Sequence, residues 1–103
     1  MSISHRYRAL TGDLRDFFQQ LPGETTPKAC NCIKAALEKL AELEEDVGDI
    51  SKMKLEHSLT PVLLKGHNKL DQGRLILLEA QEDALAGKVW DFQQAIYRLL
   101  NAL

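Results

Sequence analysis

Two cysteines, Cys30 and Cys32 in the segment KACNCIKAAL, are the residues of this sequence best suited to metal binding or redox chemistry. The segment has helical periodicity, and residues two apart on a helix point about 200° away from each other. Such a pair does not easily chelate one metal ion, and zinc-binding cysteines are usually separated by two to four residues, with a second pair elsewhere. The same geometry does not suit a disulfide. We therefore predict no metal site, with Cys30 on the inner face of a helix and Cys32 off it.

Histidines and carboxylates are the remaining candidates for catalysis. His5, His57 and His67 are scattered through the chain without ligand spacing. An acidic run comprises Glu42, Glu44, Glu45, Asp46 and Asp49. Acid–base catalysis by a carboxylate pair needs a buried environment that shifts a pKa, whereas we expect this run to be solvated. Ser58 beside His57 lacks an acid that would orient the histidine, so the residues predict neither an enzyme nor a cofactor site.

Length and charge limit the class of protein. The 103 residues suit one domain, residues 1–103, because single cores commonly contain about 100–150 residues. A net charge of −2 is too close to zero for a surface built to bind nucleic acid. No apolar run approaches the ~18 residues that a membrane span needs, and the first residues lack the apolar core of a signal peptide. We expect a cytoplasmic protein, with the nucleus as the alternative.

Apolar residues recur with a period of 3.6 along the whole chain, which predicts an all-α fold without a sheet. A first helix is expected to begin at Ser4, and Thr26 followed by Pro27 predicts the start of a second helix. Gly48 and Asp49 are expected to end this second helix. Its inward stripe is predicted to contain Cys30, Ile33, Leu37, Leu40, either Leu43 or Glu44, and Val47.

Ser51 is expected to cap a third helix, with Ile50 and Leu55 packing against each other at its start. Pro61 removes a backbone donor and clashes with the preceding turn at a cost of about 3 kcal/mol, so we expect a kink or two short helices there. The stripe of the last third is predicted to include Leu75, Leu78, Leu85, Val89, Phe92, Ile96, Leu99 and Leu103. A glycine interrupts this pattern, and we expect a turn at residues 87–88. The predicted fold is a compact bundle of about five helices.

Two groups of aromatic residues raise the question of a binding surface. Phe17 and Phe18 are adjacent, so only one of them can face fully inward, and Trp90 points about 200° away from Phe92 on a helix. Trp90 therefore either packs against the preceding helix as core or is exposed as an anchor for a partner, since Trp is enriched at binding hot spots. Phe18 and Trp90 are our candidate partner-binding residues.

Several segments match one family of helical interaction domains. They are Leu10, Leu14 and Phe17, LEKLAEL at 37–43, GDIS at 48–51, KLDQG at 69–73, Trp90, and YRLL at 97–100. Through them the chain resembles the C-terminal helical domain shared by the COPII outer-coat rod subunit and the steroid receptor RNA activator protein. By this resemblance GDIS opens a third helix, KLDQG enters a fourth, and YRLL lies in the closing helix. The resemblance implies a coat or scaffold domain of vesicle transport whose partner is a peptide segment or a coat subunit.

Two other families share shorter segments with the chain. NCIKAALEKLAELEEDVGDISKMKLEHS resembles the second and third helices of the N-terminal domain of transcription elongation factors, also found as the integrase-binding domain of chromatin-tethering coactivators. That family would hold disordered partner motifs with inter-helix loops, here residues 21–26 and 67–73. LEHSLTPVLL, together with Gly73, Arg74, Val89 and Gln93, resembles a BAG domain, the Hsp70 nucleotide exchange module. Leu85 and Ala86 replace the basic pair that a BAG domain would need, so this resemblance ranks third.

Overall fold

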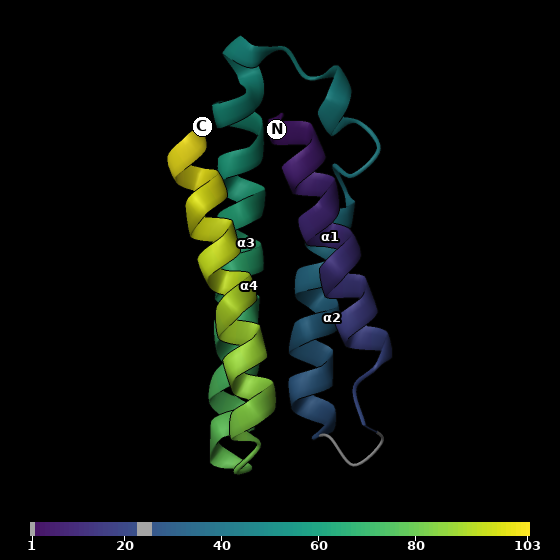
Figure 1. Cartoon of the computed structure of the whole chain (residues 1–103), viewed down its shortest axis with the longest axis vertical. Helices are drawn as coiled ribbons and strands as arrows, with labels where there is room; N and C mark the ends of the chain where they lie inside the picture. The colour runs from purple at the N-terminus through teal and green to yellow at the C-terminus, as the bar shows by residue number, and fades with distance from the viewer. Residues whose placement is uncertain (1, 23–25) are drawn as a thin grey trace.

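The computed structural model describes residues 2–22 and 26–103, and these residues form four α-helices and no strand. The helices are α1 (Ile3–Gln19), α2 (Pro27–Ala41), α3 (Lys52–Glu79) and α4 (Asp83–Ala102), with a short 3-10 helix η1 (Val47–Asp49) between α2 and α3. They run side by side in a bundle of 43 × 21 × 20 Å, with both chain termini at one end (Figure 1). The predicted all-α bundle is confirmed, whereas the expected number of about five helices is wrong.

Local signals set the start of each of the first three helices. Ser2, rather than the expected Ser4, caps α1, and its hydroxyl accepts a hydrogen bond from the backbone N–H of His5 at 3.2 Å. Pro27 is the first residue of α2, as predicted, where its missing N–H needs no partner. Ser51 is the N-cap of α3, also as predicted.

Pro61 lies inside α3, which continues from Lys52 to Glu79 without a break, so the expectation of two short helices is wrong. The proline and His57, whose carbonyl loses its helical partner, are both exposed to water. Leu59 and Leu63 on either side are fully buried, and their packing outweighs the roughly 3 kcal/mol cost of an interior proline.

The turn between α3 and α4 lies at residues 80–82, not at residues 87–88 as expected. The N–H of Gln81 donates to the carbonyl of Leu78 at 3.0 Å, and the N–H of Glu82 donates to the carbonyl of Leu77 at 2.8 Å. This pair of bonds is the Schellman motif that ends many helices, and it places Gln81 at a positive φ of 63°. Gly87 is exposed and does not interrupt α4. The helix continues through it because Ala86 and Val89, on either side, are buried and pack against the core.

The core runs along the centre of the bundle and is supplied by all four helices. Its largest fully buried side chains include Tyr7, Leu14, Ile33, Leu40, Leu59, Leu63, Leu70, Leu77, Ile96 and Leu99. A side chain Cβ on Gly66 would lie 3.2 Å from the Leu40 side chain, and one on Gly73 would lie 3.3 Å from the Cys32 Cβ. Both glycines therefore let α2 and α3 approach closely.

The predicted helical phase was wrong in two places. The inward stripe of α2 is Ala29, Ile33, Ala36 and Leu40, so Cys30 is half-buried beside the stripe, and the half-buried Cys32 faces α3. On α3 the inward residue is Leu77, and Leu75 and Leu78 lie on the outer face with 48% and 41% exposure. The expected end of the second helix at Gly48 and Asp49 is also wrong, because α2 stops at Ala41 and the acidic run follows it.

Candidate functional site

An exposed apolar surface covers the outer sides of α3 and α4. Every large hydrophobic side chain that is exposed among the described residues belongs to one of these two helices. They are Met53, Leu64, Leu75 and Leu78 on α3, and Trp90 and Tyr97 on α4. We name the five that follow Met53 (Leu64, Leu75, Leu78, Trp90 and Tyr97) the α3–α4 outer face.

Helical spacing explains why these residues share a side of the molecule. Leu75 follows Leu64 by 11 residues, which is about three turns, and Leu78 lies one turn further on. Tyr97 follows Trp90 by seven residues, about two turns. The buried residues Leu63, Leu70 and Leu77 are also seven apart, and they form the inward side of α3, turned by about 100° from the exposed set.

A buried glutamine lies beneath this face, in the seam between the two helices. Gln93 is fully buried, and its Oε1 accepts a hydrogen bond from Nε of Arg74 at 3.1 Å. Its Nε2 donates to Oδ1 of Asp71 at 3.2 Å and lies 3.3 Å from Nε2 of His67. All the hydrogen-bonding atoms of this side-chain amide therefore have partners, as a buried polar group requires.

The partners of Gln93 in turn contact the two exposed aromatic rings. Arg74 pairs with Asp71 at 2.8 Å and lies 5.3 Å from the ring centroid of Trp90, a cation–π distance. The rings of His67 and Tyr97 meet edge to face with centroids 4.7 Å apart. The network thus connects a buried amide to both aromatic side chains on the surface.

Charge in this network is balanced between two side chains. The hydrogen bond from Arg74, followed by that from Gln93, holds the pKa of the Asp71 carboxyl below its usual range. The Asp71 carboxylate and the Arg74 guanidinium are therefore both charged at neutral pH and pair with each other. The pair holds the Arg74 guanidinium over the Trp90 ring. No group of three or more His, Cys, Asp or Glu side chains suited to a metal ion occurs within the part of the chain that the structure describes.

The structure separates the two predicted anchors. Trp90 is 46% exposed and belongs to the α3–α4 outer face. Of the two predicted alternatives, exposed anchor or core residue, the packing therefore agrees with the exposed one. Phe18 is half-buried on α1 and packs against the core. Its neighbour Phe17 meets Phe92 of α4 with ring centroids 5.5 Å apart.

Sequence reasoning missed Tyr97, Leu75 and Leu78 as surface residues and Gln93 as the buried centre of the network. The seven-residue spacing between Trp90 and Tyr97 is the sequence signal that could have identified Tyr97. Of the loops considered as binding elements, residues 67–73 lie inside α3, and residues 23–25 lie outside the described residues. The segment KLDQG is therefore not the entry to a helix.

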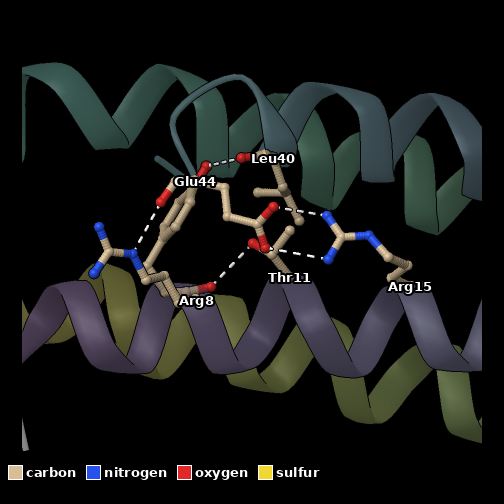
Figure 2. A network of polar contacts seen from close by, with 6 residues as sticks. Arg8, Thr11, Arg15, Leu40 and Glu44 are labelled. Atoms are coloured by element: carbon tan, nitrogen blue, oxygen red, sulfur yellow. Dashed lines mark hydrogen bonds and ion pairs between the residues drawn. The ribbon is translucent and has the colours of Figure 1, made fainter. Parts of the chain in front are cut away.

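A second polar network joins α1 to the stretch that follows α2 (Figure 2). Arg8 donates from Nε to the carbonyl of Glu44 at 3.0 Å and from a terminal nitrogen to the carbonyl of Glu45 at 3.1 Å. Arg15 pairs with the Glu44 carboxylate at 2.7 Å, so one member of the acidic run is not simply solvated. The Tyr7 hydroxyl donates to the carbonyl of Leu40, and burial raises the pKa of this phenol well above its usual range. These contacts hold α1 against α2 and the stretch that follows α2.

Comparison with known proteins supplies no relative. No family model, no curated protein and no solved structure matches this chain. Among the four helices of the described residues, none combines the length and the apolar character needed to cross a membrane.

Proposed function

We propose that this chain is a non-enzymatic protein-interaction domain that binds its partner on the α3–α4 outer face. The observation that carries the proposal is the gathering of exposed apolar residues on this face, with both aromatic rings fixed by the Gln93 network. Exposed apolar residues scattered singly need no explanation, whereas a contiguous set on one side of a molecule is typical of an interaction site.

Trp90 and Tyr97 have the properties of binding anchors. Both are 46% exposed, and both are held in place by a side chain of α3. Trp, Tyr and Arg are the residue types most enriched at hot spots. A ring that is already oriented loses less conformational entropy on binding, so the same contact area gives a tighter complex.

The charges beside the face indicate the chemistry of the partner. Lys65 and Lys69 are exposed on α3, and with Lys39 of α2 they line a shallow hollow between α2 and α3. An amphipathic helix with acidic residues along one edge would place apolar side chains on Leu64 and Leu75 and its carboxylates near these lysines.

The finer assignment rests on resemblance. We propose a coat or scaffold role in vesicle transport, in the cytoplasm, with a peptide segment or a coat subunit as the partner. The alternative is a transcription-associated adaptor that binds disordered motifs in the nucleus. Lys65 and Lys69 of α3 are the observation that favours this alternative, because exposed cations attract a disordered motif that carries acidic residues.

Calorimetric titration tests both assignments. The wild-type chain is titrated with purified COPII outer-coat subunits and, separately, with an acidic disordered segment from a transcription elongation complex. We expect one of them to bind, and Trp90→Ala to weaken binding at least tenfold, or about 1.4 kcal/mol. Lys34→Ala, an exposed change on α2, is the matched control and should leave the affinity unchanged.

Denaturant unfolding of the same variants separates an anchor from a core residue. Trp90→Ala should keep its helical signal and most of its stability because the ring is half-exposed. Phe18→Ala should lose stability because that ring packs against the core. A loss of about 3–5 kcal/mol for Trp90→Ala, or binding that is unaffected by it, would refute the assignment of Trp90 as the anchor.

A further inference from the structure

A groove between α1 and α4 carries an ordered pattern of charge that the proposed function does not use. Its apolar floor is formed by Leu10, Phe92 and Leu99. Its two walls are formed by Arg6, Ala9 and Asp13 from α1 and by Asp91, Ala95 and Arg98 from α4.

Each wall has the same order of residue types along the long axis of the bundle. The helices α1 and α4 run in opposite directions, because both termini lie at the same end (Figure 1). Arg6 and Arg98 therefore lie towards that end, Ala9 and Ala95 lie at the middle, and the two aspartates lie towards the other end. In each wall the arginine and the aspartate are seven residues apart, or about 10 Å along the helix.

Within one copy this pattern places like charges across from each other. The two arginines face each other at one end of the groove, and Asp13 faces Asp91 at the other, with Asp16 and Lys88 just beyond. None of the four wall charges belongs to an ion pair formed among residues 2–22 and 26–103. Like charges that lie close together are mildly destabilising unless opposite charges are brought to them.

We propose that a second copy of this chain covers the groove, related by a two-fold axis that runs across the groove at Ala9 and Ala95. This rotation sets α1 antiparallel on α1 of the second copy and α4 antiparallel on α4. Arg6 then meets Asp13 of the other copy, and Arg98 meets Asp91 of the other copy. Every such contact occurs twice, as a two-fold interface requires.

The groove is suited to this occupant in size and in shape. The alanines at the axis are the smallest side chains of the walls, so the two pairs of helices can approach closely there. The long side of the molecule measures 43 by 21 Å, which can accommodate the roughly 800 Å² per partner buried in a standard protein interface. An unrelated protein would need the same alternating charges in the same spacing, whereas a second copy supplies them by symmetry.

The dimer leaves the α3–α4 outer face free. Trp90 and Tyr97 contact Arg74 and His67 of α3, whereas Asp91 and Arg98, each one residue later, are turned by about 100° around α4 and line the groove against α1. The assembly would present two copies of the partner-binding face, so a partner with two binding segments would gain avidity. The dimer does not depend on the proposed function, and either can fail alone.

Sedimentation equilibrium tests the proposal over a range from about 1 μM to 1 mM, where protein self-association is commonly measured. The full chain should show a monomer–dimer equilibrium. Asp91→Arg and Arg98→Glu should each raise the dimer Kd at least about tenfold, because each creates two repulsive contacts. The double variant carrying both changes should restore the wild-type Kd, because the swapped charges complement each other again.

Mixing the two single variants gives the sharpest result. In a dimer of Asp91→Arg with Arg98→Glu, both contacts between positions 91 and 98 join opposite charges. The mixture should therefore form a heterodimer that neither variant forms with itself, detectable by native mass spectrometry. Circular dichroism should show the same helical content in all variants, since both residues are exposed.

Three results would overturn the proposal. The first is a monomer throughout the concentration range, and the second is a dimer unaffected by either charge reversal. The third is a dimer lost only with Leu75→Glu, which would place the interface on the α3–α4 outer face instead.

Discussion

The two helical hairpins of this bundle use polar side chains in opposite ways. On the α1–α2 side, Arg8 and Tyr7 donate hydrogen bonds to backbone carbonyls of α2 and the stretch after it. On the α3–α4 side, Arg74 and Gln93 bond to other side chains, and the network extends to two half-exposed rings. The first set of bonds holds α1 against α2 and the stretch after it, whereas the second set holds two exposed aromatic rings in place.

This difference indicates where a partner can bind without unfolding the domain. Arg8 bonds the carbonyls of Glu44 and Glu45, which lie in the turns between α2 and η1, so the loss of these two bonds would loosen that connection. Trp90 and Tyr97 make few contacts that the fold requires. Residues of such a surface can be mutated at a small cost in the free energy of unfolding. We therefore expect mutations in the α1–α2 hairpin to lower stability more than mutations of the exposed residues in the α3–α4 hairpin.

The largest effect is expected at Tyr7, in the α1–α2 hairpin. Tyr7→Ala removes a fully buried ring and should lower the free energy of unfolding by about 3–5 kcal/mol. Tyr7→Phe should cost only about 0.5–1.5 kcal/mol, because the Leu40 carbonyl also accepts a backbone N–H. Tyr97→Ala is the matched change in the other hairpin and should cost only about 0.5–1.5 kcal/mol, because it removes a half-exposed ring and its contact with His67. Urea titrations measure all three, and equal losses for the two alanine variants would invalidate the contrast.

An intermediate effect is expected at Gln93, the buried centre of the other network. Gln93→Ala should cost about 1–3 kcal/mol, because Arg74 and Asp71 each lose a hydrogen-bond partner in a partly buried seam. The tryptophan emission of Trp90 should shift as Arg74 becomes free to move. Gln72→Ala, an exposed glutamine on α3, is the control and should leave melting and emission unchanged. Unaltered melting of Gln93→Ala would mean that the network does not stabilise the seam.

Local signals in the sequence determined the helix starts, and tertiary contacts determined much of the rest. Pro27 and Ser51 mark the starts of α2 and α3 through chemistry that acts within one turn. Pro61 and Gly87 are equally strong local signals, yet both lie inside continuous helices because their neighbours are buried. A sequence pattern alone does not show when packing outweighs a helix-breaking residue.

The outer face could be predicted only in part, for a related reason. Residues 75–78 read Leu-Ile-Leu-Leu, so every helical phase through them is apolar and periodicity does not select the inward one. Trp90 was identified because its spacing from Phe92 excluded a shared face. Gln93 gave no such signal, since a buried glutamine is recognised by the side chains that surround it, which come from another helix.

A smaller effect is expected at the turn that joins the two helices of the α3–α4 hairpin. Gln81 has a φ of 63°, a conformation that glycine adopts without the steric cost of a Cβ. Gln81→Gly should therefore raise the free energy of unfolding by about 0.5–1 kcal/mol. Gln81→Ala lacks this advantage and should not stabilise. Thermal melts of both variants measure the difference, and a loss of stability for the glycine variant would contradict the assigned turn geometry.

The smallest effect concerns the acid stability that the Arg74–Asp71 pair gives to the α3–α4 seam. Because the folded-state pKa of Asp71 is lowered, chiefly by Arg74, the unfolded chain binds a proton here more tightly than the folded chain does. The stabilisation is therefore fully present above the ordinary aspartate pKa of about 3.9, and it is lost as the pH falls through the lower folded value.

Asp71→Asn should remove this part of the acid-induced loss of stability. Asp71 is 40% exposed, so solvent screening keeps the contribution within the 0–1 kcal/mol or so typical of surface ion pairs. Unfolding free energies measured from pH 6 down to about pH 2 should fall less steeply for the variant than for the wild type. Arg74→Gln should raise the pKa of the Asp71 carboxyl, which carboxyl-detected NMR titration follows directly. An unchanged Asp71 titration in Arg74→Gln would show that the pair does not set this pKa, and the hydrogen bond from Gln93 would then be its main cause.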